Sequence, residues 1–157
     1  MIYVFDNSTL TAVFRHYYRD SFPSFWDLFD KMIADGKIIS VREVHNEIKN
    51  YSRKDELESW AKNNTHFFHD PTPDELQFMT QIFTVPRFHN SIDMQKILKG
   101  DPIADPFIIA KAYAEHGTVV TQEVFKPNAA KIPNICEHFK ITCINLQDFL
   151  KRNNWSF

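Results

Sequence analysis

Four short apolar runs, separated by stretches with helical periodicity, constrain the fold of this chain most strongly. They cover residues 2–5, 37–40, 118–121 and 141–144. Runs of this length, rich in β-branched and aromatic residues, are typical of buried strands. Strands that alternate with helices build a parallel sheet with right-handed crossovers and helices on both faces. The sequence therefore predicts a three-layer α/β/α sandwich around a central, mainly parallel sheet of about four to five strands.

Helical periodicity accounts for most of the remaining chain. Pro86 is expected to break or kink the helix that begins at Pro73. Gly36 and Gly117 each end a helix just before a strand, where a left-handed C-cap residue is needed. Residues 66–70 form a short aromatic piece of uncertain type, and residues 125–131 form a loop. The predicted helices cover residues 8–19, 23–36, 41–51, 55–63, 73–86, 91–98, 105–116, 133–139 and 146–152.

Length and charge narrow the class of protein. The 157 residues suit a single domain, residues 1–157, with one core. A net charge of −2 argues against binding nucleic acid through a broad basic face. It leaves open a nucleic-acid enzyme whose metal ions supply positive charge locally. The sequence shows neither a signal peptide nor an apolar stretch long enough to span a bilayer, so we expect a cytoplasmic protein without a membrane partner.

Two residue types have both a structural and a functional interpretation. Cys136 and Cys143 match neither a disulfide framework nor a metal knuckle, and are expected to be reduced thiols. The fifteen phenylalanines are expected to fill the core, and the stretch from Phe14 to Phe29 holds much of the aromatic content. Alternatively, the aromatic helices there offer a surface to a partner chain or to a second subunit of a homodimer.

Acidic residues follow the predicted strands. Asp6 comes directly after the first run and Glu123 just after the third. Ligands bind outside the carboxyl ends of parallel strands, so acids at these positions lie where chemistry is usually done. Asp6, Ser8 or Thr9 can also cap the following helix, and if Asp6 faces a ligand, the two hydroxyl residues remain for capping.

Two more acidic positions belong to helix starts. Glu47 lies early in the helix after the second run, with Glu43 one turn before it as the rival for the same role. Asp105 precedes Pro106, a pattern typical of an N-cap, but the helix after it is almost wholly apolar and therefore buried. A buried acid there needs a cation or hydrogen bonds. Asp101, one short turn earlier, either assists or is solvated.

The four acids together predict a cation site. Carboxylates crowded within about 4–6 Å raise one another's pKa, so a stable group needs a cation in common. Ligation by oxygen atoms, with no convergent His or Cys, favours Mg²⁺ or Mn²⁺ over zinc. His66, His69 and Asp70 are close in sequence, but no second ligand pair accompanies them as a zinc site requires.

The motifs around these acids resemble those of the PIN-domain ribonucleases, over nearly the whole chain. They read F-D-N-S at Asp6, V-H-N-E-I at Glu47, A-D-P-F-I-I-A-K-A at Asp105 and V-V-T-Q-E-V-F at Glu123. The run K-I-P-N-I-C-E at residues 131–137 is similar to an uncharacterised bacterial branch of that superfamily. The resemblance implies a PIN-like fold and metal-dependent cleavage of RNA. It also implies, in many members, a toxin opposed by a cognate antitoxin.

The resemblance further implies roles for individual residues. Asp6, Glu47, Asp105 and Glu123 would be the catalytic metal ligands, with hydroxyl support from Ser8 and Thr121. One departure is that the last acid, commonly Asp in such proteins, is Glu123 here, which would shift or weaken a second metal position. Lys126 and Lys131 follow Glu123 and either contact the RNA backbone or are ordinary surface lysines.

Two other functions compete with the nuclease. A PIN-like binding protein would keep the acids but act by sequestering RNA or a protein partner. An aspartyl-phosphate phosphatase also begins with an Asp after the first strand. That class usually has a second Asp two residues later, where this chain has Ser8.

Overall fold

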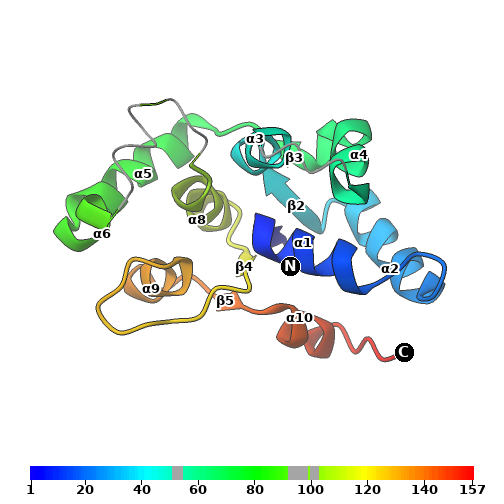
Figure 1. The fold of residues 1–157 in the computed structure, drawn as a ribbon. Coiled ribbons are helices and arrows are strands. Elements are labelled where there is room, and N and C mark those ends of the chain that lie inside the picture. The colour runs from blue at the N-terminus through cyan, green and yellow to red at the C-terminus, as the bar shows by residue number, and fades with distance from the viewer. Residues whose placement is uncertain (51–54, 92–98, 100–102) are drawn as a thin grey trace.

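The computed structural model describes residues 1–50, 55–91, 99 and 103–157, which form a three-layer α/β/α domain (Figure 1). Their strands build a five-stranded sheet in the order β3-β2-β1-β4-β5, and every neighbouring pair is parallel. This confirms the predicted three-layer α/β/α class and the predicted number of strands. The strands are β1 (Tyr3–Phe5), β2 (Ile38–Val41), β3 (Phe68–His69), β4 (Thr118–Val120) and β5 (Cys143–Ile144).

Helices cover both faces of the sheet. In Figure 1 the sheet runs from β3 at the top to β5 at the bottom, with α8 and α9 to its left and α1, α2 and α10 to its right. No helix in the described part of the chain is both long enough and apolar enough to cross a bilayer. The helices are α1 (Asn7–His16), α2 (Pro23–Ala34), α3 (Arg42–Asn50), α4 (Glu56–Asn63), η1 (Thr65–Phe67), α5 (Pro73–Thr84), α6 (Pro86–Ser91), α8 (Asp105–Ala114), α9 (Ile132–His138) and α10 (Leu146–Arg152).

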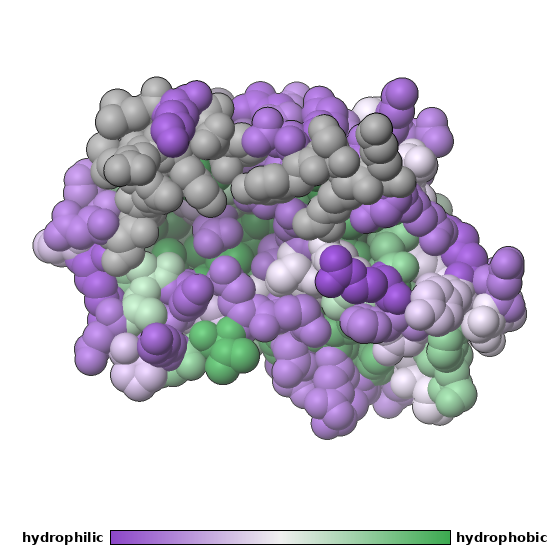
Figure 2. Space-filling view, in the orientation of Figure 1, coloured by the Kyte–Doolittle hydropathy of each residue, from purple (hydrophilic) through white to green (hydrophobic). Residues whose placement is uncertain are grey.

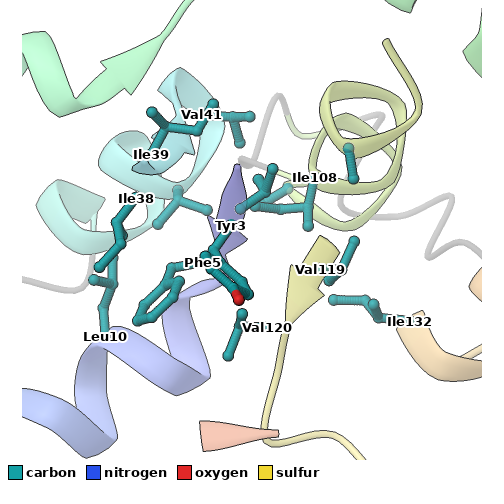
Figure 3. Packing of buried hydrophobic residues seen from close by; sticks show 14 of the residues in the cluster. Tyr3, Phe5, Leu10, Ile38, Ile39, Val41, Ile108, Val119, Val120 and Ile132 are labelled. Carbon is teal, nitrogen blue, oxygen red and sulfur yellow. The ribbon is translucent and has the colours of Figure 1, made fainter. Parts of the chain in front are cut away.

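The core lies where the central strands meet these two helical layers. Successive strand residues point to opposite faces of the sheet, and Phe5 points to the face that α2 and α10 cover. There its ring packs on Phe29 of α2 and Phe149 of α10. Figure 3 shows the same strands meeting Leu10 of α1 and Ile108 of α8. The heavy aromatic content therefore fills the interior between the sheet and the helices.

The aromatic side chains of the helices near the N-terminus pack mainly into this core. Phe14, Phe25, Trp26 and Phe29 are buried, whereas Tyr18 is 62% exposed. The prediction of core packing is thus confirmed for these four rings. Of the two cysteines, Cys136 is buried and Cys143 half-buried, and both are free.

Most predicted elements occur, with shorter ends. The break at Pro86 is confirmed, since α5 ends at Thr84 and α6 begins at Pro86. The aromatic piece at residues 66–70 consists of η1 and the two-residue strand β3. The helix predicted for residues 91–98 lies outside the described residues, apart from Ser91 at the end of α6.

The two helix-to-strand glycines serve different purposes. Gly36 has φ +71°, as expected for a left-handed C-cap. The same expectation for Gly117 is wrong, because the left-handed residue there is His116, with φ 50°. A Cβ atom on Gly117 would lie 2.6 Å from the carbonyl oxygen of Ile2. Gly117 is therefore needed for the close approach of the chain to β1.

A buried ion pair fixes α8 to α5. The Lys111 Nζ lies 2.8 Å from Glu75 Oε1, and the two side chains are 3% and 2% exposed. Lys111 also donates to the carbonyl oxygen of Asp70 at 3.2 Å, while Glu75 and Thr72 form the capping box of α5. Removing one partner of such a pair leaves an uncompensated buried charge.

We expect Lys111→Met to lower the free energy of unfolding by about 3–5 kcal/mol, measured by urea denaturation. Adding Glu75→Gln should recover much of the loss, because the buried charge is then gone. The exposed pair of Lys31 and Asp35 supplies the control, since Lys31→Met should cost only about 0.5 kcal/mol. Equal losses for Lys111→Met and Lys31→Met would contradict this interpretation of the buried pair.

Candidate active site at the carboxyl edge of the sheet

Asp6 lies at the end of β1, buried and fully hydrogen-bonded. Its Oδ1 accepts from the backbone N–H of Thr9 at 2.9 Å, and Ser8 Oγ lies 2.8 Å from each carboxylate oxygen. Thr121 Oγ1 donates to Oδ2 at 2.5 Å. Of the three capping candidates, Asp6 is therefore the N-cap of α1. Capping and a place in the site are compatible here because the carboxylate has two oxygen atoms.

Two hydroxyl groups join Asp6 to the chain after β4. Thr121 Oγ1 accepts from the backbone N–H of Glu123 at 3.1 Å, and Ser8 Oγ accepts from the N–H of Gln122 at 3.0 Å. Burial raises the pKa of Asp6 above its ordinary value, while hydrogen bonds from Thr121, Thr9 and Ser8 act in the opposite direction. The two residues predicted as hydroxyl supports thus both contact the Asp6 carboxylate.

Asp105 is the first residue of α8 and is half-buried. The N-cap of α8 is Ala104, which makes no side-chain capping bond, so the N-cap interpretation of Asp105 is wrong. Asp105 therefore stands at the first position of a buried helix. Apolar residues of this helix, Ile108 and Ile109 among them, lie in the core. An acid in this position is partly removed from water, and no capping bond of its own compensates for that.

The electrostatics of Asp105 show that the three other predicted acids all act on it. Burial is the largest cause that raises the pKa of Asp105 to about 7, and the negative charges of Glu123, Glu47 and Asp6 add to it. The positive charge of Lys131 acts in the opposite direction. Charges influence a pKa in this way only at short range, so these acids from four segments share one region of the carboxyl edge.

Glu47 of α3 holds two other elements at this edge. Its Oε1 accepts from the backbone N–H of Ala104 at 3.2 Å, and its Oε2 accepts from Asn7 Nδ2 at 3.2 Å. Glu47 thereby links α3 to the starts of α1 and α8. Sequence reasoning did not single out Asn7, and the only signal for it was its place beside Asp6 after a buried strand.

Glu43, the rival of Glu47, takes part in a different contact. It is 6% exposed and its Oε1 lies 2.8 Å from Arg42 Nη2. Its Oε2 is buried and has no hydrogen-bond partner among the described residues. Arg42 also faces Asp70, at 3.7 Å. Of the two α3 carboxylates, Glu47 is therefore the one that acts on Asp105, and Glu43 belongs to the pair with Arg42.

Glu123 is oriented by α9. Its Oε2 accepts from the backbone N–H of Ile132 at 2.9 Å, at the first residue of that helix. Lys131, directly before Ile132, is exposed and lies close enough to act on Asp105. Lys126 is exposed on the loop between Glu123 and Lys131. Asp101, the remaining predicted supporting residue, lies outside the described residues.

The chemistry of the donors suits a hard divalent cation. Four carboxylates and two hydroxyl groups supply oxygen atoms only, and the like charges around Asp105 call for a compensating cation. As the side chains stand, however, no group of three or more His, Cys, Asp or Glu among the described residues is arranged to hold a metal ion. Hydrogen bonds instead occupy oxygen atoms of Asp6, Glu47 and Glu123.

Comparisons with known proteins agree with this architecture. The model of a family described as "Domain of unknown function (DUF4411)" matches residues 3–157. A comparison with curated proteins finds no significant match. A chain in the crystal structure of VapBC2 from Rickettsia felis, bound to a DNA fragment from their promoter, is similar in structure. The TM-score is 0.51 at 16% identity, over 92% of this chain and 98% of that chain. At this identity the likeness concerns the fold.

The raised pKa of Asp105 predicts how stability varies with pH. The pKa of this carboxyl is 3.8 in the unfolded chain and about 7 in the folded chain. Between these values the folded state keeps a proton that the unfolded state has lost, so its stability falls as the pH rises. With divalent metals removed by a chelator, Asp105→Asn should raise the free energy of unfolding at about pH 8 by on the order of 2 kcal/mol, because it removes the disfavoured charge.

The gain should shrink as the pH is lowered toward about 4 and disappear below about pH 3, where the carboxyl is protonated in both states. Chemical denaturation at a series of pH values measures it. Asp27→Asn, at an exposed position of α2, is the matched control and should leave the pH profile unchanged. A gain for Asp105→Asn that is the same at every pH would show that charge crowding is not its cause.

Proposed function

We propose that this chain, which belongs to the DUF4411 family, is a divalent-metal-dependent ribonuclease that hydrolyses phosphodiester bonds of RNA. The observation that supports it most is that Asp6, Glu47 and Glu123 all raise the pKa of Asp105 at the carboxyl edge of the parallel sheet. This edge is where open α/β sheets bind their ligands. The likeness in fold to a VapBC2 chain agrees with the proposal.

The four carboxylates would hold Mg²⁺ or Mn²⁺, with Asp105 as the least constrained ligand. When bound, the metal would lower the pKa of a water molecule and stabilise charge on the phosphate oxygens. Asp6 is kept in place by Ser8 and Thr121, so its carboxylate would lose little freedom on binding. Asp105 would release the proton that it holds near neutral pH when the cation arrives, which couples metal binding to pH.

The hydrogen bonds at the site define what would have to change. Glu47 and Glu123 each give an oxygen atom to a backbone N–H, of Ala104 and Ile132 respectively. A carboxylate can keep one such bond and ligate with its other oxygen, as ligating carboxylates commonly do. The side chains would therefore have to rotate from their present positions to assemble the ligands.

We extend the proposal to the partners of the enzyme. Its substrate would be RNA, and its activity would be held in check by a cognate antitoxin protein. The similar chain was crystallised as part of VapBC2 bound to a DNA fragment from their promoter, which supports an antitoxin partner and a homodimeric toxin for this chain. A toxin with this role would act in the cytoplasm, where its RNA substrate is.

A second candidate is a PIN-like binding protein without catalytic activity. One observation favours it, namely that no metal-binding group is assembled among the described residues. Such a protein would sequester RNA or a protein partner and would show no metal affinity, alone or with RNA. The charge crowding at Asp105 speaks against it, because an inactive site has no reason to retain a destabilising cluster.

Cleavage of single-stranded RNA in Mg²⁺ or Mn²⁺ tests the enzyme directly. We expect Asp6→Asn and Asp105→Asn each to lower the cleavage rate at least about 100-fold, because each removes a charged ligand of the metal. Asp27→Asn, on the exposed surface of α2, should cleave like the wild type. Full activity in both site variants would exclude the assignment, and metal-independent cleavage would exclude the mechanism.

A further inference from the structure

A cavity of about 390 Å³ lies beside the loop that follows Glu123, outside the acidic group. Its walls come from three segments that are distant in sequence, namely α6, the loop between β4 and α9, and α9 itself. The lining combines an aromatic ring, amides and charged groups, and it includes Arg87, Phe125, Asn128, Asn134, Glu137 and His138. This mixture differs from the apolar lining that is common in pockets for small hydrophobic ligands.

The loop beside the cavity has a fixed backbone. Asn134 is buried, and its Nδ2 donates to the carbonyl oxygen of Lys126 at 2.7 Å. Its Oδ1 accepts from the N–H of the same residue at 3.4 Å. The turn is completed by the Ala129 N–H, which donates to the Lys126 carbonyl oxygen at 3.1 Å, and by Asn128 with φ 63°. One buried amide of α9 thus ties the backbone of the loop to that helix at Lys126.

This fixed loop presents apolar side chains to the outside. Val124 is 77% exposed and Phe125 is 47% exposed, in spite of the cost of leaving such groups in water. Figure 2 shows a green apolar area among hydrophilic side chains at the lower edge of the view, over the loop that joins β4 and α9 in Figure 1. The Phe125 ring, which is 47% exposed and lines the cavity, is available for stacking.

The cavity is close to the proposed site of cleavage. Phe125 is two residues from Glu123, so their Cα atoms are at most about 7 Å apart. Lys131, at the other end of the loop, acts on Asp105. The loop is therefore within reach of a nucleotide next to one whose phosphate lies at the acids.

We propose that this cavity receives one unpaired base of single-stranded RNA, next to the phosphate that is cleaved. Phe125 stacks on the base, as aromatic side chains do in proteins that bind single strands. Arg87 of α6 lines the same cavity, and its guanidinium, which lies 4.8 Å from the centre of the Phe88 ring, offers a second planar group. Asn128 and His138 supply hydrogen-bonding groups for the base edge. The inference rests on the proposed ribonuclease function and deepens it, since it names the form of the substrate.

The test is a double-mutant cycle between protein and RNA. The background is Asp105→Asn, which prevents cleavage, and the probe is a 5′-labelled single-stranded RNA in which one base at a time is removed to leave an abasic residue. Fluorescence anisotropy measures the Kd of each RNA for the protein with and without Phe125→Ala. At one RNA position we expect each change alone to weaken binding about tenfold and both together to weaken it no further.

Matched variants separate stacking from other contacts. Phe125→Tyr keeps an aromatic ring and should retain binding, whereas Phe125→Leu keeps an apolar side chain and should weaken it nearly as much as Phe125→Ala. Tyr113→Ala is the control, because it removes another exposed ring, on α8. Its effect should be independent of every abasic position.

Additive effects of Phe125→Ala and base removal at every RNA position would overturn the inference, as would full binding by Phe125→Leu, which would indicate a surface for an apolar peptide. A parallel cleavage assay with Asp105 restored distinguishes the ribonuclease proposal from the proposal of a base-binding cavity. Cleavage without coupling leaves the nuclease and rejects the base pocket. Coupling without cleavage supports the pocket in a protein that binds RNA and rejects the nuclease.

Discussion

Repulsion among carboxylates at the carboxyl edge of the sheet is the constraint on which the rest of this structure depends. Asp6, Glu47 and Glu123 all raise the pKa of Asp105, so the fold places like charges together where burial already disfavours them. An arrangement of this kind costs stability in the absence of a cation. The surrounding hydrogen bonds and helix packing serve to keep these groups together in spite of that cost.

Each acid is held by a different device. Asp6 is fixed by capping α1 and by two hydroxyl groups, Glu47 by the chain before α8, and Glu123 by the start of α9. α8, which carries Asp105, is itself anchored to α5 by the buried pair of Lys111 and Glu75. The side chains that would bind metal are therefore oriented by contacts that persist without it, which is the arrangement that precise chemistry requires.

The parts of the fold that depend on local pattern could be predicted from the sequence. The central strands and most helices follow from apolar runs and periodicity, and the acids after β1 and β4 could be placed at one edge because parallel strands share it. The strand β3 could not be predicted, since a two-residue strand exists only through its pairing with β2. Nor could the sequence separate Glu43 from Glu47, because both face nearly the same way on α3. Only the fold shows that Glu43 pairs with Arg42 while Glu47 acts on Asp105.

Several functional details depend on tertiary contacts that no local signal reveals. Asp105 looks like an N-cap in sequence, yet α8 begins one residue earlier than that pattern implies. Lys111 appears as one lysine in an apolar helix, and only the fold supplies Glu75 as its buried partner. Asn134 likewise becomes informative only when its amide is seen to hold the backbone of Lys126.

Anomalous scattering from a crystal soaked in Mn²⁺ tests the central claim most directly, because it locates the cation without reference to activity. We predict an anomalous peak bounded by the carboxylates of Asp6, Glu47, Asp105 and Glu123, absent from crystals of Asp105→Asn prepared in the same way. Carboxylates that stay in their present hydrogen bonds, with no peak among them at saturating Mn²⁺, would contradict the account.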